Sequence, residues 1–454
     1  MSEPPRDPYS ALRHAGYRRY LAGNLLSNVG RQALSVAAAW QIYQWTNSAT
    51  ALGLVGFFNV LPLLALILPA GALADRVDRR LIIMRSMVVS ALLSAALVAT
   101  SHFHAAIPAL PVLRDANALL HRVALVFEQQ VDPASLRFDN PALPIIYLIL
   151  FLHAIVRVLG NPARGAIVPQ LVPLSAVGNA VTWNSSTMEL STLVGPALGG
   201  LLVALWGYSA VYLLDVVFSL WLGAALLGVH LAHAPPRTAP PPAGAFAGAA
   251  FIWRHKPVLA AMALDLFAVV LGGATALLPI YADKILHVGP AGLGWLRAAP
   301  AAGAIVMAFV SAHRAPYRRP GVVMLWSVAG FGFAIALFGL STSLWLSLFA
   351  LFLTGVFDNV SVVVRHSLVQ LMTPDALRGR VTAVNQLFVG SSNEISALRA
   401  GLSAALFGPV VAAAGGGAGT IAVTLLVALL IPALRTVPPL HTLAEQRRDH
   451  AAEG

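Results

Sequence analysis

The chain has 454 residues, of which 58% are hydrophobic and only 10% are charged, with a net charge of +11 and a mean hydropathy of +0.77. Soluble proteins carry roughly 25% charged residues, so a soluble enzyme and a nucleic-acid-binding protein are both excluded. The chain has no cysteine, which excludes disulfides and Cys-ligated metal sites. The composition therefore predicts an integral protein of the lipid bilayer.

Twelve stretches are long and apolar enough to cross a bilayer, which takes about 20 residues of helix. In chain order they are 19–45, 50–73, 81–101, 144–163, 177–204, 208–231, 257–282, 291–312, 321–341, 344–366, 381–412 and 417–435. These stretches predict an all-α membrane protein with 12 transmembrane helices, flanked by tails at 1–18 and 436–454.

Basic residues are concentrated on the side of the spans that holds both tails. That side holds 22 of the 29 lysines and arginines, Arg157, Arg164 and Arg365 among them, against four on the opposite side. Because cytoplasmic loops carry the excess of Lys and Arg, both termini are expected in the cytoplasm. The preference for arginine over lysine is typical of GC-rich bacteria, so we expect a multi-pass protein of a bacterial inner (plasma) membrane.

The loop between spans 2 and 3 reads Gly71-ALA-Asp75-Arg76-V-Asp78-Arg79-Arg80. A tight turn favours glycine, and a carboxylate at this position can pair with a cation or a helix N-terminus on another part of the molecule. Such a contact would form in one conformational state of the protein and break in another. We predict a gating motif at Gly71, Asp75, Arg76, Arg79 and Arg80, in which the last two arginines also set the topology.

The loop 102–143 lies on the side opposite to the termini. Apolar residues recur in it at helical spacing, at Leu113, Ala116, Leu120, Val123 and Phe127. The pattern predicts an amphipathic helix on the outer membrane surface. Two alternatives stay open, namely a lid over an outer vestibule and a docking site for a periplasmic partner.

Span 5 contains the string Gly195-Pro196-AL-Gly199-Gly200. Small residues let membrane helices approach closely, and proline bends a helix. We therefore predict a helix-packing motif at these positions.

The segment 232–256 contains the Pro-rich stretch APPRTAPPPAGAF, which cannot continue a helix. It predicts a cytoplasmic linker between two halves of six spans each, 19–231 and 257–435. Sequence recurs between the halves, since Arg164-GAIVP-Gln170-LVP follows span 4 and Arg365-HSLV-Gln370-LMTP follows span 10. Two related halves predict a pseudo-two-fold axis and a substrate path at their interface.

Ionisable side chains inside a membrane helix cost about 2.5–3.5 kcal/mol each, so they are candidates for function. Five acids fall within the spans: Glu189, Asp215, Asp265, Asp358 and Glu394. We predict that the proton-coupling residues are among Glu394, Asp265, Asp358 and Glu189, with Asp215 less favoured. The alternative for each acid is a static ion pair that holds the helices together.

Three arginines, Arg31, Arg297 and Arg399, also fall within the spans. Arginine suits anionic and catecholate groups, so we predict that the substrate cavity includes Arg31, Asn28, Gln32, Asn359 and Arg399. The histidines show no metal-ligand spacing and no phosphate-binding loop is present. Neither a metal nor another cofactor is therefore expected.

The loop motif at 71–80 resembles the signature Gly-xxx-Asp-Arg/Lys-x-Gly-Arg-Arg/Lys of the major facilitator superfamily, with Asp78 in place of the second glycine. The span 5 string resembles the core of the motif of its antiporter branch, with Ser191 where an upstream glycine is expected. Longer stretches, including TGVFDNVSVVVRHSLVQLMTPDALRGRVTAVN, resemble the bacterial exporter branch that includes the enterobactin exporter and macrolide efflux proteins.

The resemblance implies the major facilitator fold, with two pseudo-symmetric six-helix halves and a cavity lined by spans 1, 4, 7 and 10. It would place Arg31, Asp265 and Asp358 in that cavity. Exporters of this branch often read Ser-Asn-Glu-Leu-Gly-Glu-Phe-Glu-Ser-Gly in span 11. Here Glu394 is kept, whereas Ala397 and Arg399 replace two further acids.

We therefore expect a monomeric, non-enzymatic secondary transporter that works by alternating access. It would export a small amphipathic molecule, such as a siderophore, a macrolide or a drug, in exchange for protons. One alternative is a proton-coupled importer of a metabolite. Another is a receptor or assembly factor that does not transport and that uses the loop 102–143.

Overall fold

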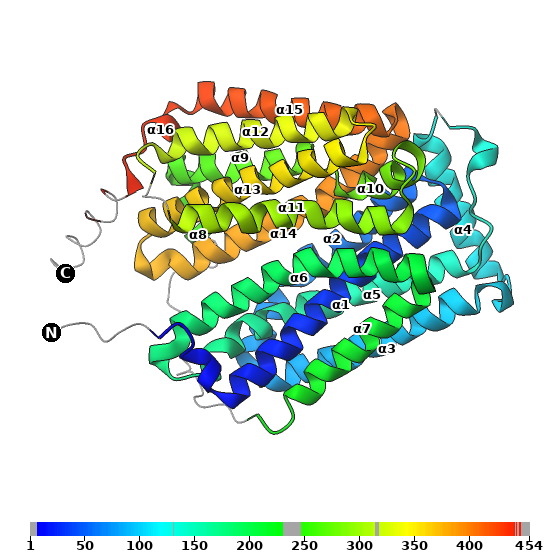
Figure 1. Ribbon diagram of the computed structural model, residues 1–454, viewed down its shortest axis with the longest axis horizontal. Coiled ribbons are helices and arrows are strands. Elements are labelled where there is room, and N and C mark those ends of the chain that lie inside the picture. Colours follow the sequence, from blue (N-terminus) through cyan, green and yellow to red (C-terminus); the bar gives the residue numbers. More distant parts are fainter. Residues whose placement is uncertain are drawn as a thin grey trace.

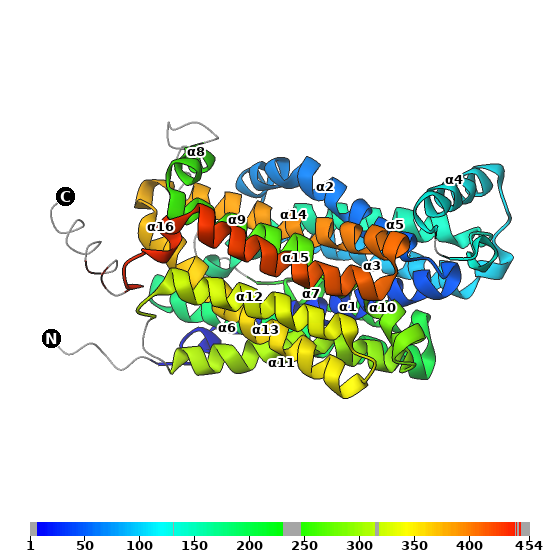
Figure 2. The same cartoon turned by 90° about the horizontal axis from the view of Figure 1, so that it is seen from above.

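The computed structural model describes residues 7–129, 131–229, 247–313 and 317–440, together with 442 and 445. Within these ranges, twelve long helices form two bundles of six that lie side by side (Figure 1). The described ends of the chain lie at one end of the molecule, which we call the terminal end. The opposite end, where the short helix α4 lies, is called the distal end (Figures 1 and 2).

The first bundle consists of α1 (Ala15–Thr46), α2 (Ala49–Arg76), α3 (Arg79–His102), α5 (Ala142–Ile167), α6 (Val177–Trp206) and α7 (Tyr208–Ala225). The second consists of α9 (Lys256–Gly272), α11 (Gly289–Ala312), α12 (Pro320–Leu340), α13 (Leu344–Met372), α14 (Asp375–Phe407) and α15 (Pro409–Leu430). Short turns and α10 (Leu278–Ile280) prolong α9 to Ile285. The remaining helices are α4 (Pro111–Phe127), α8 (Ala247–Arg254) and α16 (Pro432–Arg435).

Ten helices in the described ranges are long and apolar enough to cross a membrane by length and composition alone. The two exceptions among the twelve are α1 and α14. Both carry polar side chains, such as the buried Asn24 and Gln41 on α1 and Asn385 on α14, and these residues lower their mean hydropathy. The prediction of twelve membrane-length helices in two halves is confirmed, and the most polar of them lie at the interface of the halves.

The prediction was wrong at the boundary between the last two spans. It ended span 11 at 412 and began span 12 at 417, whereas the helices meet at Gly408, which turns the chain with a positive φ of 82°. The small residues that follow suggested a connection, but they form the packing face of α15. A side chain at Gly417 would collide with the backbone of Ala336 on α12.

The loop 102–143 contains the predicted helix, α4, whose apolar face packs against α2, α5 and α14. Its end is fixed by the buried Glu128, whose carboxylate accepts hydrogen bonds from the Ser48 hydroxyl and, at 2.9 Å, from the Thr50 backbone N–H. These groups begin α2, where a negative charge is favourable. The helix α4 thus caps the first half and also touches the second.

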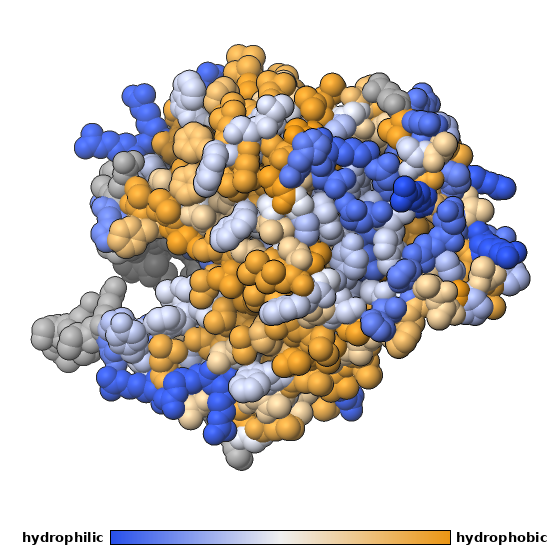
Figure 3. All heavy atoms as spheres, turned by 45° about the vertical axis from the view of Figure 1, so that its right-hand side comes forward, coloured by the Kyte–Doolittle hydropathy of each residue, from blue (hydrophilic) through white to orange (hydrophobic). Residues whose placement is uncertain are grey.

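The surface is mostly apolar along the bundle, with hydrophilic residues gathered over the distal end (Figure 3). Large hydrophobic side chains such as Leu92, Trp326 and Leu429 are exposed on the long helices, as expected for helices that face lipid. The predicted linker 232–256 lies outside the described residues up to 246, and its last part forms α8.

Candidate functional site

A cavity of about 640 Å³ lies between the two bundles. Most of its lining comes from the first half, through α1, α2, α3, α5, α6 and α7, and the second half contributes α11, α14 and the segment after α9. Its charged lining residues are Arg31, Arg157, Arg164, Arg297, Asp215 and Glu394. Four arginines therefore face two carboxylates, so the cavity is positively charged.

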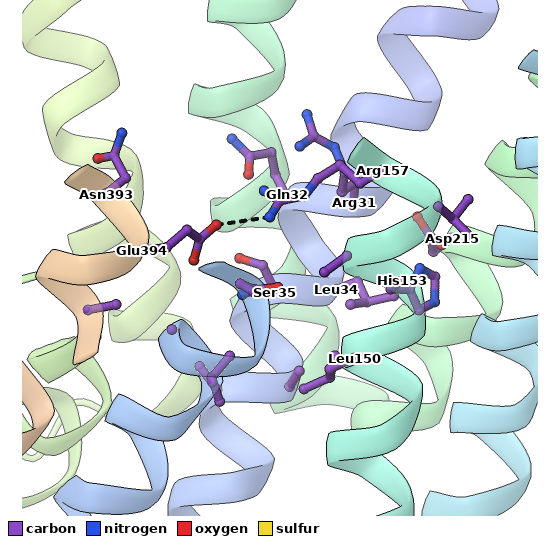
Figure 4. Close-up of a pocket in the computed structure, with 18 of the residues that line it drawn as sticks. Arg31, Gln32, Leu34, Ser35, Leu150, His153, Arg157, Asp215, Asn393 and Glu394 are labelled. Atoms are coloured by element: carbon purple, nitrogen blue, oxygen red, sulfur yellow. Dashed lines mark hydrogen bonds and ion pairs between the residues drawn. The ribbon is translucent and has the colours of Figure 1, made fainter. Parts of the chain in front are cut away.

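One ion pair joins the two halves inside the cavity. Arg157 of α5 donates from Nη2 to Oε1 of Glu394 of α14 at 2.9 Å (Figure 4). Both side chains are largely buried, with 30% and 17% of their surfaces exposed. The Arg157–Glu394 pair is thus shielded from bulk solvent and can form only while the two halves are together at this level.

The other three cavity arginines have neutral hydrogen-bond partners. Arg31 donates to Oδ1 of Asn28 at 2.9 Å, and Arg297 donates to the Ser35 hydroxyl at 2.6 Å. Arg164 lies 3.3 Å from the Ser27 hydroxyl. In the part of the chain that the structure describes, none of the three forms an ion pair. Their guanidinium groups can therefore bind oxygen atoms of a molecule in the cavity.

We counted Arg157 and Arg164 among the basic residues of the terminal side and did not predict them as cavity residues. Helix α5 continues through Pro162 to Ile167, so both arginines lie on a membrane-length helix and face the cavity. A proline inside a membrane helix is tolerated where neighbouring helices pack around it. The arginines occur at 157 and 164, one heptad apart and thus on one helix face, and this spacing was a signal that we missed.

Asp265 lies outside the central cavity, in the interior of the second half. It forms a buried ion pair with Arg365 of α13, which we had also counted among the basic residues of the terminal side. A narrow pocket beside this pair is lined by Asp358 and Ser361. The placement of Asp265 and Asp358 in the central cavity, which the family resemblance implied, is therefore corrected, because α13 packs against α11 and α12 instead of lining the cavity.

The remaining predicted site residues do not all lie in the central cavity. Gln32 lines the cavity and donates to the Thr192 hydroxyl at 3.2 Å. Arg399 is not one of the lining residues and donates to the Gly273 carbonyl oxygen at 3.3 Å. Asn359 lies on α13, and Glu189 is exposed on α6. The structure thus brings Arg31, Gln32 and Glu394 together in the cavity lining. Asn28 is not a lining residue, and it accepts a hydrogen bond from Arg31.

The loop motif after α2 holds the end of α5. The guanidinium group of Arg79 donates to the carbonyl oxygen of Ala166 at 3.0 Å, and Oδ1 of Asp78 accepts the Arg80 backbone N–H at 2.9 Å. Gly71 is in open space and Arg76 is exposed. The side chain of Asp75 lies outside the described part, so its gating role stays a prediction.

The halves meet closely along two helix pairs, α2 with α14 and α6 with α11. Glycines face each other at both crossings, since a Cβ added at Gly200 would lie 2.7 Å from Cα of Gly294, and one at Gly401 would lie 2.5 Å from Cα of Gly53. The predicted packing motif is divided between two contacts. Gly195 and Gly199 pack against α1 in the same half, while Gly200 faces the other half.

Further contacts between the halves lie toward the distal end. Gln44 donates to Oδ1 of Asp283 at 3.0 Å, and the Lys284 ammonium lies 6.0 Å from the centre of the Tyr43 ring. In Figure 1 the helices α6 and α11 are close at the distal end and diverge toward the terminal end. The distal side of the cavity is thus closed by packed helices.

Comparison with known proteins identifies the family. The model of the Major Facilitator Superfamily matches residues 20–320 and 266–453. The chain belongs to this superfamily.

Curated exporters and solved transporters resemble this superfamily member over nearly its full length. It is 27% identical to the enterobactin exporter EntS of Citrobacter koseri over 428 residues, which covers 93% of each chain. It is 26% identical to EntS of Escherichia coli (strain SMS-3-5 / SECEC), with 95% of this chain and 96% of the relative covered. The early resemblance to the exporter branch is confirmed, and the protein is a transporter and not an enzyme.

Two solved structures share the fold of this superfamily member. One is a bacterial homolog of the human lysosomal transporter Spinster, inward-facing and unoccupied, with a TM-score of 0.65, 14% identity, and coverage of 96% of this chain and 100% of that one. The other is a D-xylose–proton symporter with a TM-score of 0.65, 13% identity, and coverage of 93% and 99%. At such identities the likeness shows the major facilitator fold alone. Together with the relatives it makes the protein a multi-pass transporter of the inner membrane that acts on small molecules.

The environment of Asp265 leads to a first prediction for this transporter. Asp265→Asn leaves the buried Arg365 without its counter-charge, which typically costs about 3–5 kcal/mol. We expect a clear fall in the melting temperature of the purified protein, whereas the double variant Asp265→Leu with Arg365→Met restores much of it. Thermal unfolding in detergent measures both. A variant Asp265→Asn that melts like the wild type but no longer moves protons would instead support a coupling role for Asp265.

Proposed function

We propose that this transporter exports an oxygen-rich amphipathic molecule of the catecholate siderophore type and exchanges it for protons by alternating access. The observation that carries the proposal is the set of four arginines that line the central cavity, three of them bound only to neutral groups. Two of its relatives are named enterobactin exporters, which supports the substrate class.

The chemistry of the cavity suits such a molecule. Guanidinium groups donate several hydrogen bonds in a fixed geometry and stack on aromatic rings, so Arg31, Arg164 and Arg297 can bind carbonyl and phenolic oxygens. Apolar side chains, such as Leu34 and Leu150, offer surface for rings between these groups. A volume of about 640 Å³ falls within the range for ligands of drug size. The excess of positive charge disfavours cationic drugs.

We place the terminal end in the cytoplasm, as the distribution of basic residues predicts. The contacts of α2 with α14 and of α6 with α11, which we call the two seams, then close the periplasmic side. The cavity receives its substrate from the cytoplasm. Because one chain supplies both halves and all the lining of the cavity, we further propose that a monomer is the transporting unit. Glu394 is a candidate proton carrier as it faces the cavity. The role of the loop 102–143 in binding a periplasmic partner stays a prediction.

The proposal is tested by uptake of enterobactin into inside-out vesicles. A pH gradient with an acidic vesicle interior drives the uptake. We expect uptake by the wild type, and a KM raised about tenfold or more in Arg297→Gln and Arg164→Gln, because one hydrogen bond to a charged group contributes about 1.5–3 kcal/mol. The exposed Arg318 provides a matched control, and Arg318→Gln should leave the KM unchanged.

Three results would contradict the proposal. An uptake rate that does not depend on the pH gradient would contradict proton exchange. A preference for the cationic rhodamine 6G over enterobactin would overturn the substrate class. Accumulation of enterobactin by intact cells that carry the transporter, without loading of inside-out vesicles, would support the importer alternative.

A further inference from the structure

A further buried acid, Asp215, lies at one end of a short hydrogen-bonded chain in the first half. Asp215 of α7 is 3% exposed, and its Oδ2 accepts a hydrogen bond of 2.6 Å from the Ser94 hydroxyl of α3. The same hydroxyl oxygen lies 3.2 Å from Nε2 of His153 of α5. Both Asp215 and His153 line the central cavity, and Figure 4 shows them side by side, across Arg31 and Arg157 from Glu394.

The electrostatic surroundings of Asp215 differ from those of the two interior acids that form ion pairs. Glu394 is paired with Arg157 and Asp265 with Arg365, whereas no described cation lies within 4.0 Å of the Asp215 carboxylate. The charged groups that face it at longer range are Arg31 of α1 and Arg164 of α5.

Among the helices packed against α7, α1 carries the Arg31 named above, and the others add little charge. Helix α3 contributes the neutral Ser94, and the acid of α6, Glu189, is exposed. The partners of Asp215 are therefore a hydroxyl and, through it, an imidazole, both of which can accept or donate a proton.

The donors and acceptors of the chain allow two arrangements. When Asp215 is ionised, Ser94 must donate to it, so Nε2–H of His153 donates to Ser94 and Nδ1 is a bare acceptor. When Asp215 is protonated, it donates to Ser94, Ser94 donates to Nε2, and the imidazole hydrogen is on Nδ1. One proton that arrives at Nδ1 thus appears at Asp215 after two transfers, and no further atom is gained or lost.

We propose that Asp215, Ser94 and His153 form a proton-binding site of this transporter, at which a proton and a substrate hydroxyl compete for Nδ1 of His153. The proposal rests on the exchange proposed above. Phenolic hydroxyls have a pKa of about 10 and so remain donors at neutral pH. Such a hydroxyl donates to the bare Nδ1 of the proton-free chain, whereas the proton-loaded chain presents N–H at this atom and cannot accept it. Competition of this kind is what exchange requires.

The test measures enterobactin binding to the purified transporter in detergent as a function of pH, together with the protons released on binding, which a pH dye records in weak buffer. For the wild type we expect release of protons and a Kd that rises by roughly tenfold per pH unit on the acid side, as for competition with one proton. In Asp215→Asn both effects should disappear, whereas affinity at high pH is retained.

Two further comparisons make the result specific. Ser94→Ala interrupts the chain and should abolish proton release, while Ser94→Thr keeps the hydroxyl and should retain it. This pair decides the question even if Asp215→Asn fails to fold. Asp139→Asn, at an exposed position in the distal loop, is the matched control and should behave as the wild type.

The outcomes separate the two proposals. If the wild type releases protons and Ser94→Ala and Asp215→Asn do so equally, the site proposed here is wrong and proton exchange stands. If the wild type binds enterobactin without releasing protons at any pH, and a pH gradient drives no uptake, proton exchange itself is wrong.

Discussion

Replacing Gly200 with leucine is expected to abolish transport and to hold the distal side of the transporter open. A Cβ at this position would lie 2.7 Å from Cα and 2.8 Å from the backbone nitrogen of Gly294, distances that no relaxation of a side chain can relieve. Helices α6 and α11 would have to separate, and the state with a closed distal side would be lost. Gly401→Leu should act in the same way, because its Cβ would meet Gly53 on the other seam.

The absence of cysteine from the chain makes this prediction direct to measure. A single cysteine introduced for Ala39, which lines the cavity on α1, reacts alone with a maleimide that does not cross membranes. In intact cells we expect slow labelling with Gly200 in place and labelling at least tenfold faster in Gly200→Leu. Gly178→Leu is the control on the same helix, since this glycine has open space around it. Equal labelling and normal transport in Gly200→Leu would show that the seam does not close the distal side.

The helices were predictable from the sequence because their length and apolar character are properties of single segments. The glycine motif in span 5 was predictable for the same reason, since small residues in a membrane helix indicate close packing. Even here the partner could not be read from the sequence. Gly199 and Gly200 are neighbours in the chain, yet one faces α1 of the same half and the other faces α11 of the other half.

The site was only partly predictable, because the sequence does not fix which helix faces meet. Asp265 and Glu394 each looked like an isolated acid in an apolar span. In the structure, Asp265 is paired within its own half, while the partner of Glu394 lies 237 residues away in the other half. The rotation of α5 brings Arg157 to that position. The spacing of Arg157 and Arg164 places both on one face of α5, but the helices that this face meets depend on the packing of α5 against α2 and α3.

The least favoured acid of the sequence, Asp215, shows the same limit. We favoured it less than the other four acids, but α7 packs against both α1 and α3, and this contact brings the carboxylate to Ser94 and to the cavity. His153 carried no metal-ligand spacing and so offered no signal. Its significance arises from a hydroxyl on another helix, 59 residues away.

The second large effect is expected at the Arg157–Glu394 pair. Glu394→Gln removes the only acid that is paired with a cavity arginine among the described residues and leaves Arg157 without its counter-charge. Because breaking a buried pair typically costs about 3–5 kcal/mol, the state in which the halves meet at this level should be strongly disfavoured. We expect the rate of pH-driven enterobactin uptake to fall at least a hundredfold. Arg157→Gln should do the same from the other side of the pair.

A charge exchange distinguishes a latch between the halves from a proton carrier. The double variant Arg157→Glu with Glu394→Arg restores the attraction across the interface, so a latch should regain a substantial part of its transport rate relative to either single variant. Coupled substitutions of this kind are analysed as a double-mutant cycle, in which the interaction energy measures the contribution of the pair itself.

If Glu394 is instead the proton carrier, a carboxylate on α5 cannot replace it. The exchange variant would then move substrate without protons or not move it at all. Because Asp215 is left intact in every one of these variants, proton release that persists in the exchange variant would assign coupling to the first half and closure of the cavity to the interface.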